Sequence, residues 1–143
     1  MSGLAALVAG HNPPDVYRWH SATHVEDVQH AAEQAGWTFA YLDGWTIEDA
    51  ASFRKAVAAA CGLDDAAAES LDALDAALAA HSPSGSGTVL LWDGWSPFAR
   101  HDESAFNDAL AMLRRRTEAG GFAAVLRGDG PDLELPELPI KHD

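Results

Sequence analysis

Two apolar runs, residues 38–42 and 88–92, each lead into the same turn sequence, Asp-Gly-Trp. A short apolar run that ends in Asp-Gly predicts a buried strand followed by a turn, because Asp bonds back to nearby backbone and Gly accepts a positive φ. Residues 16–19 and 122–126 predict two more short strands. The pattern therefore predicts four strands spread along the chain.

Between these strands, apolar residues recur at the three- and four-residue spacing of amphipathic helices. The stripes are Phe53, Val57 and Ala60 in one segment, Leu71, Leu74 and Leu78 in the next, and Phe106, Leu110 and Leu113 in the last. The first stripe predicts a helix over residues 48–61 that ends at Gly62. The helix predicted by the last stripe ends at the Gly120-Gly121 pair. Upstream, Thr23-His-Val-Glu26 is a capping-box pattern that opens a helix ending at Gly36.

The predicted elements follow the order strand, helix, strand, helix, helix, strand, helix, strand. Strands that alternate with helices predict an α/β fold, with a parallel sheet, right-handed crossovers and helices packed on the sheet. The length fits one domain, which we place at residues 1–127, with the first strand and helix as an N-terminal extension. Residues 81–87 predict a flexible loop, and residues 128–143, rich in proline and acids, predict an untethered tail.

Charge is distributed unevenly along the chain. The formal net charge is −13, and no Lys or Arg lies between Lys55 and Arg100. Nucleic acids and anionic membranes are bound through clusters of Lys and Arg, so the composition argues against both as ligands. A basic protein partner fits this charge, although an excess of acids also serves solubility.

Five acids of the base-free segment fall on or just before the helix with the leucine stripe: Asp64, Asp65, Glu69, Asp72 and Asp75. On a helical wheel, Glu69, Asp72 and Ala76 lie away from the leucines, and no base within one turn neutralises the acids. Asp75 lies closer to the leucines, where a carboxylate needs a partner or a route to water. The surface is either an ordinary solvated face or a docking face.

Residues for other kinds of chemistry are sparse. The single cysteine, Cys61, allows no internal disulfide and fits a packed small side chain. The seven histidines show no zinc spacing, and the alanines around the acids supply no second catalytic group, so we expect no metal, no cofactor and no enzymatic activity. The N-terminus has neither the basic residues of a signal peptide nor the length of a membrane span, which predicts a cytoplasmic protein.

The tryptophans bear on the predicted sheet. Trp37 and Trp92 lie in predicted strands and are expected in the core. Trp45 and Trp95 follow the turns at the carboxyl ends of strands, where open α/β sheets often bind ligands. Tryptophan is also a frequent interface anchor, but we expect both to pack in the core.

Residues 39–126 resemble the barstar family, small intracellular inhibitors of the secreted ribonuclease barnase. The resemblance rests on features in a fixed order: the turn Asp43-Gly-Trp-Thr-Ile47, a helix, Leu63-Asp64, the motif Leu71-Asp-Ala-Leu74, the strand Val89-Leu-Leu-Trp92, a helix, Gly120 and a closing strand. It implies a small parallel sheet flanked by helices, to which residues 16–35 add a strand and a helix. It also implies an inhibitor that acts in the cytoplasm without catalysis.

The resemblance further implies that the acidic helix and the loop before it, residues 64–76, enter the basic active site of a secreted microbial ribonuclease of the guanyl-specific type. The complex would be a one-to-one heterodimer. The partner-binding residues would then be Asp64, Asp65, Glu69, Asp72, Asp75 and Ala76. Among them, Asp72 matches an inhibitory aspartate of the family.

Several positions depart from the family pattern. Ala76 stands where the family has its dominant aspartate, and Asp75 stands where it has a tryptophan. Ala66 replaces the loop tyrosine, and Arg115 lies near the position of a glutamate. These differences leave open a barstar-like interaction or immunity module for a different basic partner. A small acid–base hydrolase, which would need a cleft that joins two carboxylates to a histidine, is a third alternative.

Overall fold

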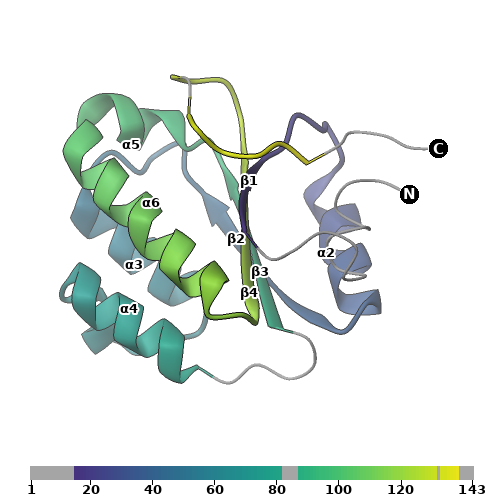
Figure 1. Cartoon of the computed structure of the whole chain (residues 1–143), viewed down its shortest axis with the longest axis horizontal. Coiled ribbons are helices and arrows are strands. Elements are labelled where there is room, and N and C mark those ends of the chain that lie inside the picture. Colours follow the sequence, from purple (N-terminus) through teal and green to yellow (C-terminus); the bar gives the residue numbers. More distant parts are fainter. Residues whose placement is uncertain (1–14, 82–86, 132, 139–143) are drawn as a thin grey trace.

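The computed structural model describes residues 15–81, 87–131 and 133–138, which form a parallel sheet between two layers of helices (Figure 1). The strands are β1 (Val16–Arg18), β2 (Trp37–Asp43), β3 (Gly87–Asp93) and β4 (Phe122–Arg127). The helices are α2 (Val25–Gln34), α3 (Ala50–Ala60), the 3-10 helix η1 (Asp65–Ala68), α4 (Leu71–Ala80), α5 (Ser96–His101) and α6 (Glu103–Glu118). The predicted α/β fold with four strands in this order is confirmed.

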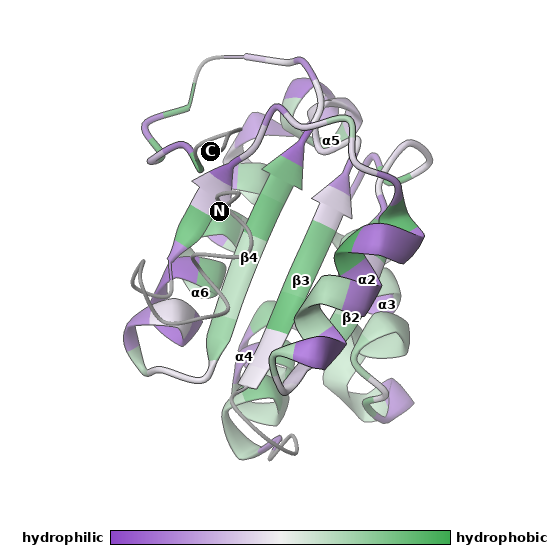
Figure 2. Ribbon diagram, turned by 90° about the vertical axis from the view of Figure 1, so that its right-hand side faces the viewer, coloured by the Kyte–Doolittle hydropathy of each residue, from purple (hydrophilic) through white to green (hydrophobic). Residues whose placement is uncertain are grey.

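The sheet has the order β1-β4-β3-β2, and every pair is parallel. The central strands β3 and β4 are buried on both faces, which explains why they are nearly continuous apolar runs in the sequence. Figure 2 shows both strands green along much of their length, β3 pale at its start and arrowhead, and both purple at the tips of their arrows. The register sets Asp43 beside Asp93 and Asp93 beside Arg127, so polar residues gather at the carboxyl edge.

Each face of the sheet has its own apolar cluster. Helices α3 to α6 cover one face, where Trp92 packs against Phe53 and Phe106 with ring centroids 5.1 and 5.8 Å apart (Figure 1). Helix α2 lies on the other face and buries Val28 and Ala32 in the second cluster. Within the described ranges, no helix is both long and apolar enough to cross a bilayer.

Two helix starts differ from the sequence expectation. The capping box at Thr23 is wrong: α2 begins at Val25 after His24, without a side-chain cap. The Thr23 hydroxyl instead lies 2.6 Å from the Ser21 hydroxyl, and its carbonyl accepts a hydrogen bond from Arg127. Helix α3 begins at Ala50, because the carboxylate of Asp49 accepts the backbone N–H of Ser52 at 2.8 Å.

The expectation of an untethered tail is wrong for residues 133–138. Arg18 donates its backbone N–H to Pro136 at 2.9 Å, and Leu138 donates to the Arg18 carbonyl at 2.8 Å. The Leu138 side chain is 2% exposed. The segment runs beside β1 because this edge strand has backbone groups that β4 does not pair. Residues 139–143 lie outside the described ranges.

The tryptophans divide into buried and exposed positions. Trp37, Trp92 and Trp95 are buried as predicted. The core assignment is wrong for Trp45, which is 58% exposed. Its ring lies on the backbone of Gly94 at the edge of the sheet, beyond the reach of the helices that enclose Trp95.

Candidate docking surface

The candidate surface consists of η1 and α4 with the residues that join them, from Asp64 to Ala80. Gly62 ends α3 at a φ of 69°, and Leu63 donates its backbone N–H to the Ala58 carbonyl at 2.8 Å. This turn directs the chain into η1. The Arg54 Nε donates to the Ala68 carbonyl at 2.9 Å and fixes the end of η1 against α3. The loop therefore has a defined position on the helical layer.

Helix α4 starts independently of that loop. The Ser70 hydroxyl accepts the backbone N–H of Ala73 at 2.9 Å, an N-cap that the sequence analysis missed. The signal was present, because Ser immediately before an apolar-periodic segment is a common helix start. Leu74 is fully buried, whereas Leu71 and Leu78 are partly buried. The leucine stripe thus faces the core as predicted, and the opposite face of α4 points outward.

Four of the predicted carboxylates, those of Asp64, Asp65, Glu69 and Asp72, are exposed. Asp64, Asp65 and Glu69 belong to the loop and η1, whereas Asp72 lies in the first turn of α4. In the described part of the chain none of the four forms an ion pair. Ala76 is exposed one turn beyond Asp72. Four exposed carboxylates without an ion pair among the described residues thus lie along the candidate surface, from the loop before η1 to the first turn of α4.

Asp75 differs from the other four acids because it has internal partners. Its Oδ1 lies 2.7 Å from the Arg116 Nε, and its Oδ2 lies 3.4 Å from an Nη of Arg115. The Asp75 side chain is only 21% exposed, between α4 and α6. The helical wheel indicated that the Asp75 carboxylate requires a partner, and these ion pairs supply it. They also reduce the negative charge that Asp75 can offer to another protein. The run of arginines at the end of the last predicted helix was the signal for them.

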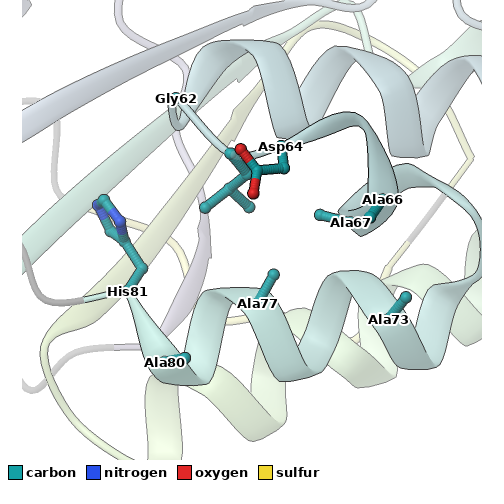
Figure 3. A pocket seen from close by; sticks show the side chains of 9 residues that line it. Gly62, Asp64, Ala66, Ala67, Ala73, Ala77, Ala80 and His81 are labelled. Carbon is teal, nitrogen blue, oxygen red and sulfur yellow. The ribbon is translucent and has the colours of Figure 1, made fainter.

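An open groove of about 480 Å³ separates the loop from α4. Its lining comprises Gly62, Leu63, Asp64, Ala66, Ala67, Ala73, Ala77, Ala80 and His81. Figure 3 shows Ala66 and Ala67 on the loop side facing Ala73 and Ala77 on α4, with Asp64 above and His81 at one end. A groove floored by methyl groups and bordered by a carboxylate suits an inserted side chain with a basic end.

The chemistry of this groove is limited. It contains one carboxylate and one imidazole, whereas the hydrolase hypothesis needs two carboxylates beside a histidine. Burial raises the pKa of Cys61 to about 11, which disfavours its thiolate. Among the described residues no group of three or more His, Cys, Asp or Glu side chains could hold a metal ion. The arrangement is suited to binding.

A second polar cluster lies at the carboxyl edge of the sheet. Arg127 donates from Nε and Nη2 to the two Asp93 oxygens, at 2.6 and 2.8 Å. The Tyr41 hydroxyl donates to Asp93 at 3.0 Å, and burial together with this bond raises the Tyr41 pKa to about 12. Arg127 also donates to the carbonyls of Ser21 and Thr23. All these groups are bonded to one another, so the cluster joins β2, β3 and β4 to the loop before α2.

Comparison with known proteins identifies a family and solved structures of similar fold. The family model described as "Barstar (barnase inhibitor)" matches residues 37–128, well over half of the chain. No curated protein matches the chain. Among solved structures, an Aeropyrum pernix ORC2 protein in ADPNP–ADP complexes is similar, with 17% identity and a TM-score of 0.54. The match covers 89% of this chain and 39% of that one, and at this identity it shows the fold alone.

Proposed function

The chain belongs to the barstar family, and on this basis we propose that it inhibits a secreted microbial ribonuclease by blocking the enzyme's basic active site. The observation that carries the proposal is the set of exposed carboxylates at Asp64, Asp65, Glu69 and Asp72, none of which forms an ion pair with another described residue. The family model covers all four positions. Inhibition here is occlusion, so it involves no catalysis and no cofactor.

Electrostatics supply the physical reason for the pairing. A ribonuclease binds the phosphates of RNA with basic side chains, and a surface with several carboxylates imitates that polyanion. The net charge of −13 would steer a basic protein toward this chain and make the association rate fall with added salt. We propose that the basic partner is a guanyl-specific ribonuclease, bound in a one-to-one complex.

We propose different roles for the candidate residues, according to their positions in the structure. Asp72 is the proposed central anchor, because it is exposed in the first turn of α4 and matches an inhibitory aspartate of the family. Asp64 borders the groove, where it would accept a hydrogen bond from a basic side chain inserted between η1 and α4. Asp75, paired with Arg116, would serve mainly to hold α4 against α6. Ala76 would offer a small contact surface in place of a charge.

The proposed place of action is the cytoplasm of the cell that makes the ribonuclease. A cell that exports such an enzyme must neutralise molecules that remain inside, and a tight inhibitor that stays behind meets that need.

Inhibition assays with a panel of guanyl-specific ribonucleases test the proposal. We expect the protein to suppress RNA cleavage by at least one of them, and Asp72→Ala to weaken that complex by at least about 2 kcal/mol. Asp27→Ala is a matched control, since Asp27 is an exposed aspartate in the first turn of α2 on the other face of the sheet. Absence of inhibition across the panel at micromolar concentration would contradict the proposal.

A second candidate is a barstar-like immunity or interaction module for a basic partner that is not a ribonuclease. It is favoured by Ala76, which carries no charge where the family has its dominant aspartate, and by Asp75, whose charge is compensated by Arg116. Affinity purification from the source cell separates the two candidates. Recovery of a stoichiometric basic partner without nuclease activity would support the second.

A further inference from the structure

Trp45 is the one large hydrophobic side chain that is exposed among the described residues, at 58%. It follows the carboxyl end of β2, at the edge where the strand arrows in Figure 2 end in polar residues. Figure 1 places α5, which follows the carboxyl end of β3, at one end of the helical layer and α4 at the other. Trp45 is therefore remote from the groove beside α4.

One face of the Trp45 indole ring lies against the backbone of two glycines. A Cβ added to Gly94 would lie 2.5 Å from the indole Cδ2, and one added to Gly128 would lie 3.8 Å from Cη2. Gly44 donates its backbone N–H to the Asp93 carbonyl at 2.7 Å, and Trp45 donates its backbone N–H to the Asp43 carboxylate at 3.3 Å. One face of the ring thus rests on glycine backbone while the other is open. A ring fixed before binding loses little entropy when a partner covers it.

Other tryptophans near this edge already have cationic partners. The Arg18 guanidinium lies 4.8 Å from the centroid of the Trp95 ring, and that of Arg127 lies 5.6 Å from Trp19. No described cation lies over Trp45, whose nearest charged neighbour in sequence is the exposed carboxylate of Asp43. An arginine stacks on an indole face through its planar guanidinium and pairs with a carboxylate through its N–H groups. Trp45 and Asp43 offer both contacts.

We propose that Trp45 and Asp43 form a second interaction surface, which binds an arginine-bearing segment of a basic polypeptide. The guanidinium covers the open face of the indole and donates to the Asp43 carboxylate. Charge complementarity argues for this occupant, because the chain has a net charge of −13 and the Arg127 charge at this edge is already paired with Asp93. The surface is separate from the acidic residues 64–76 and does not depend on ribonuclease inhibition.

The test uses the full chain labelled with nitrogen-15 and the peptide acetyl-Gly-Arg-Gly-Arg-Gly-amide as the probe. The indole N–H signal of Trp45, assigned with Trp45→Phe, should shift saturably, whereas the same peptide with citrulline in place of arginine should leave it unmoved. Trp45→Ala should weaken peptide binding at least about fivefold. Unchanged positions of the other indole signals check that this variant is folded, and Trp45→Phe, which keeps an aromatic face, should retain intermediate affinity.

Three results would overturn the proposal. The first is equal affinity of Trp45→Ala and the parent chain for the arginine peptide, which would indicate unspecific attraction. The second is a shift of the Trp45 signal with protein concentration alone, which would make a second copy the occupant. The third is a loss of affinity in Asp72→Ala as large as in Trp45→Ala, which would place the peptide on the acidic helix. That last result would leave ribonuclease inhibition untouched.

Discussion

A double-mutant cycle on Asp75 and Arg116 measures how firmly α4 is held against α6. At 4 Å two unit charges attract by about 4 kcal/mol when the effective dielectric constant is about 20. Desolvation and loss of side-chain freedom remove most of this energy. Exposed pairs contribute about 0.2–1 kcal/mol, whereas loss of one partner from a buried pair costs about 3–5 kcal/mol. Since both side chains are 21% exposed at a separation of 2.7 Å, we expect a coupling energy of about 1–2 kcal/mol.

The assay is urea unfolding of the parent chain, Asp75→Asn, Arg116→Gln and the double variant at one protein concentration. The coupling energy is the difference between the double effect and the sum of the single effects. Arg115, at 3.4 Å, would retain part of the attraction to Asp75, so Arg116→Gln should destabilise less than Asp75→Asn. A coupling below about 0.3 kcal/mol would refute the idea that this pair fixes α4 to α6.

Two further predictions follow from the edges of the sheet. Leu138→Ala should lower the free energy of unfolding by about 2–3 kcal/mol because the side chain is 2% exposed, and a loss under about 0.5 kcal/mol would mean that the tail does not hold β1 in solution. The Tyr41 pKa is raised to about 12, above the ordinary value of 10.0, so the folded chain retains this proton where the unfolded chain loses it. Stability should therefore fall as the pH rises from 10 to 12, and Tyr41→Phe should lose this part of the pH dependence; ultraviolet titration of Tyr41 near pH 10 would contradict the assignment.

Local signals were sufficient for most of the fold. The Asp-Gly-Trp turns mark the ends of β2 and β3, because a turn of this kind depends on two adjacent residues. Apolar periodicity located α3, α4 and α6, because it records which face of a helix is buried, whereas the four-residue η1 was not predicted. The short α5 was not separated from α6, since Asp102 ends one helix and caps the other with a bond to Ala105.

Contacts between distant segments could not be predicted in this way. The two turns have the same sequence, yet Trp95 is enclosed by α6 and the aromatic core while Trp45 rests on Gly94 in solvent. The tail looks unstructured by composition, but its backbone pairs with β1, and backbone pairing depends little on the side chains that composition counts. The burial of a side chain depends on the neighbours that the fold supplies.

On the candidate surface too, features of a single helix could be predicted from the sequence, whereas contacts between segments could not. The exposure of Asp72 followed from the helical wheel, because its position away from Leu74 is a property of one helix. Glu69 is exposed as predicted but precedes α4, at the end of η1. The ion pair of Asp75 with Arg116 spans two helices and required the packing angle between them. The groove between η1 and α4 likewise depends on where Gly62 turns the chain.

The docking surface is almost independent of the core that supports it. From Asp64 to Ala76 only Ala67 and Leu74 are buried, and Ser70 starts α4 without help from the residues before it. Substitutions at the outward positions would therefore change the partner while leaving the free energy of folding nearly unaltered. If this surface docks a partner as proposed, such an arrangement would let the protein follow changes in that partner over evolution, one exposed residue at a time, without passing through unfolded intermediates.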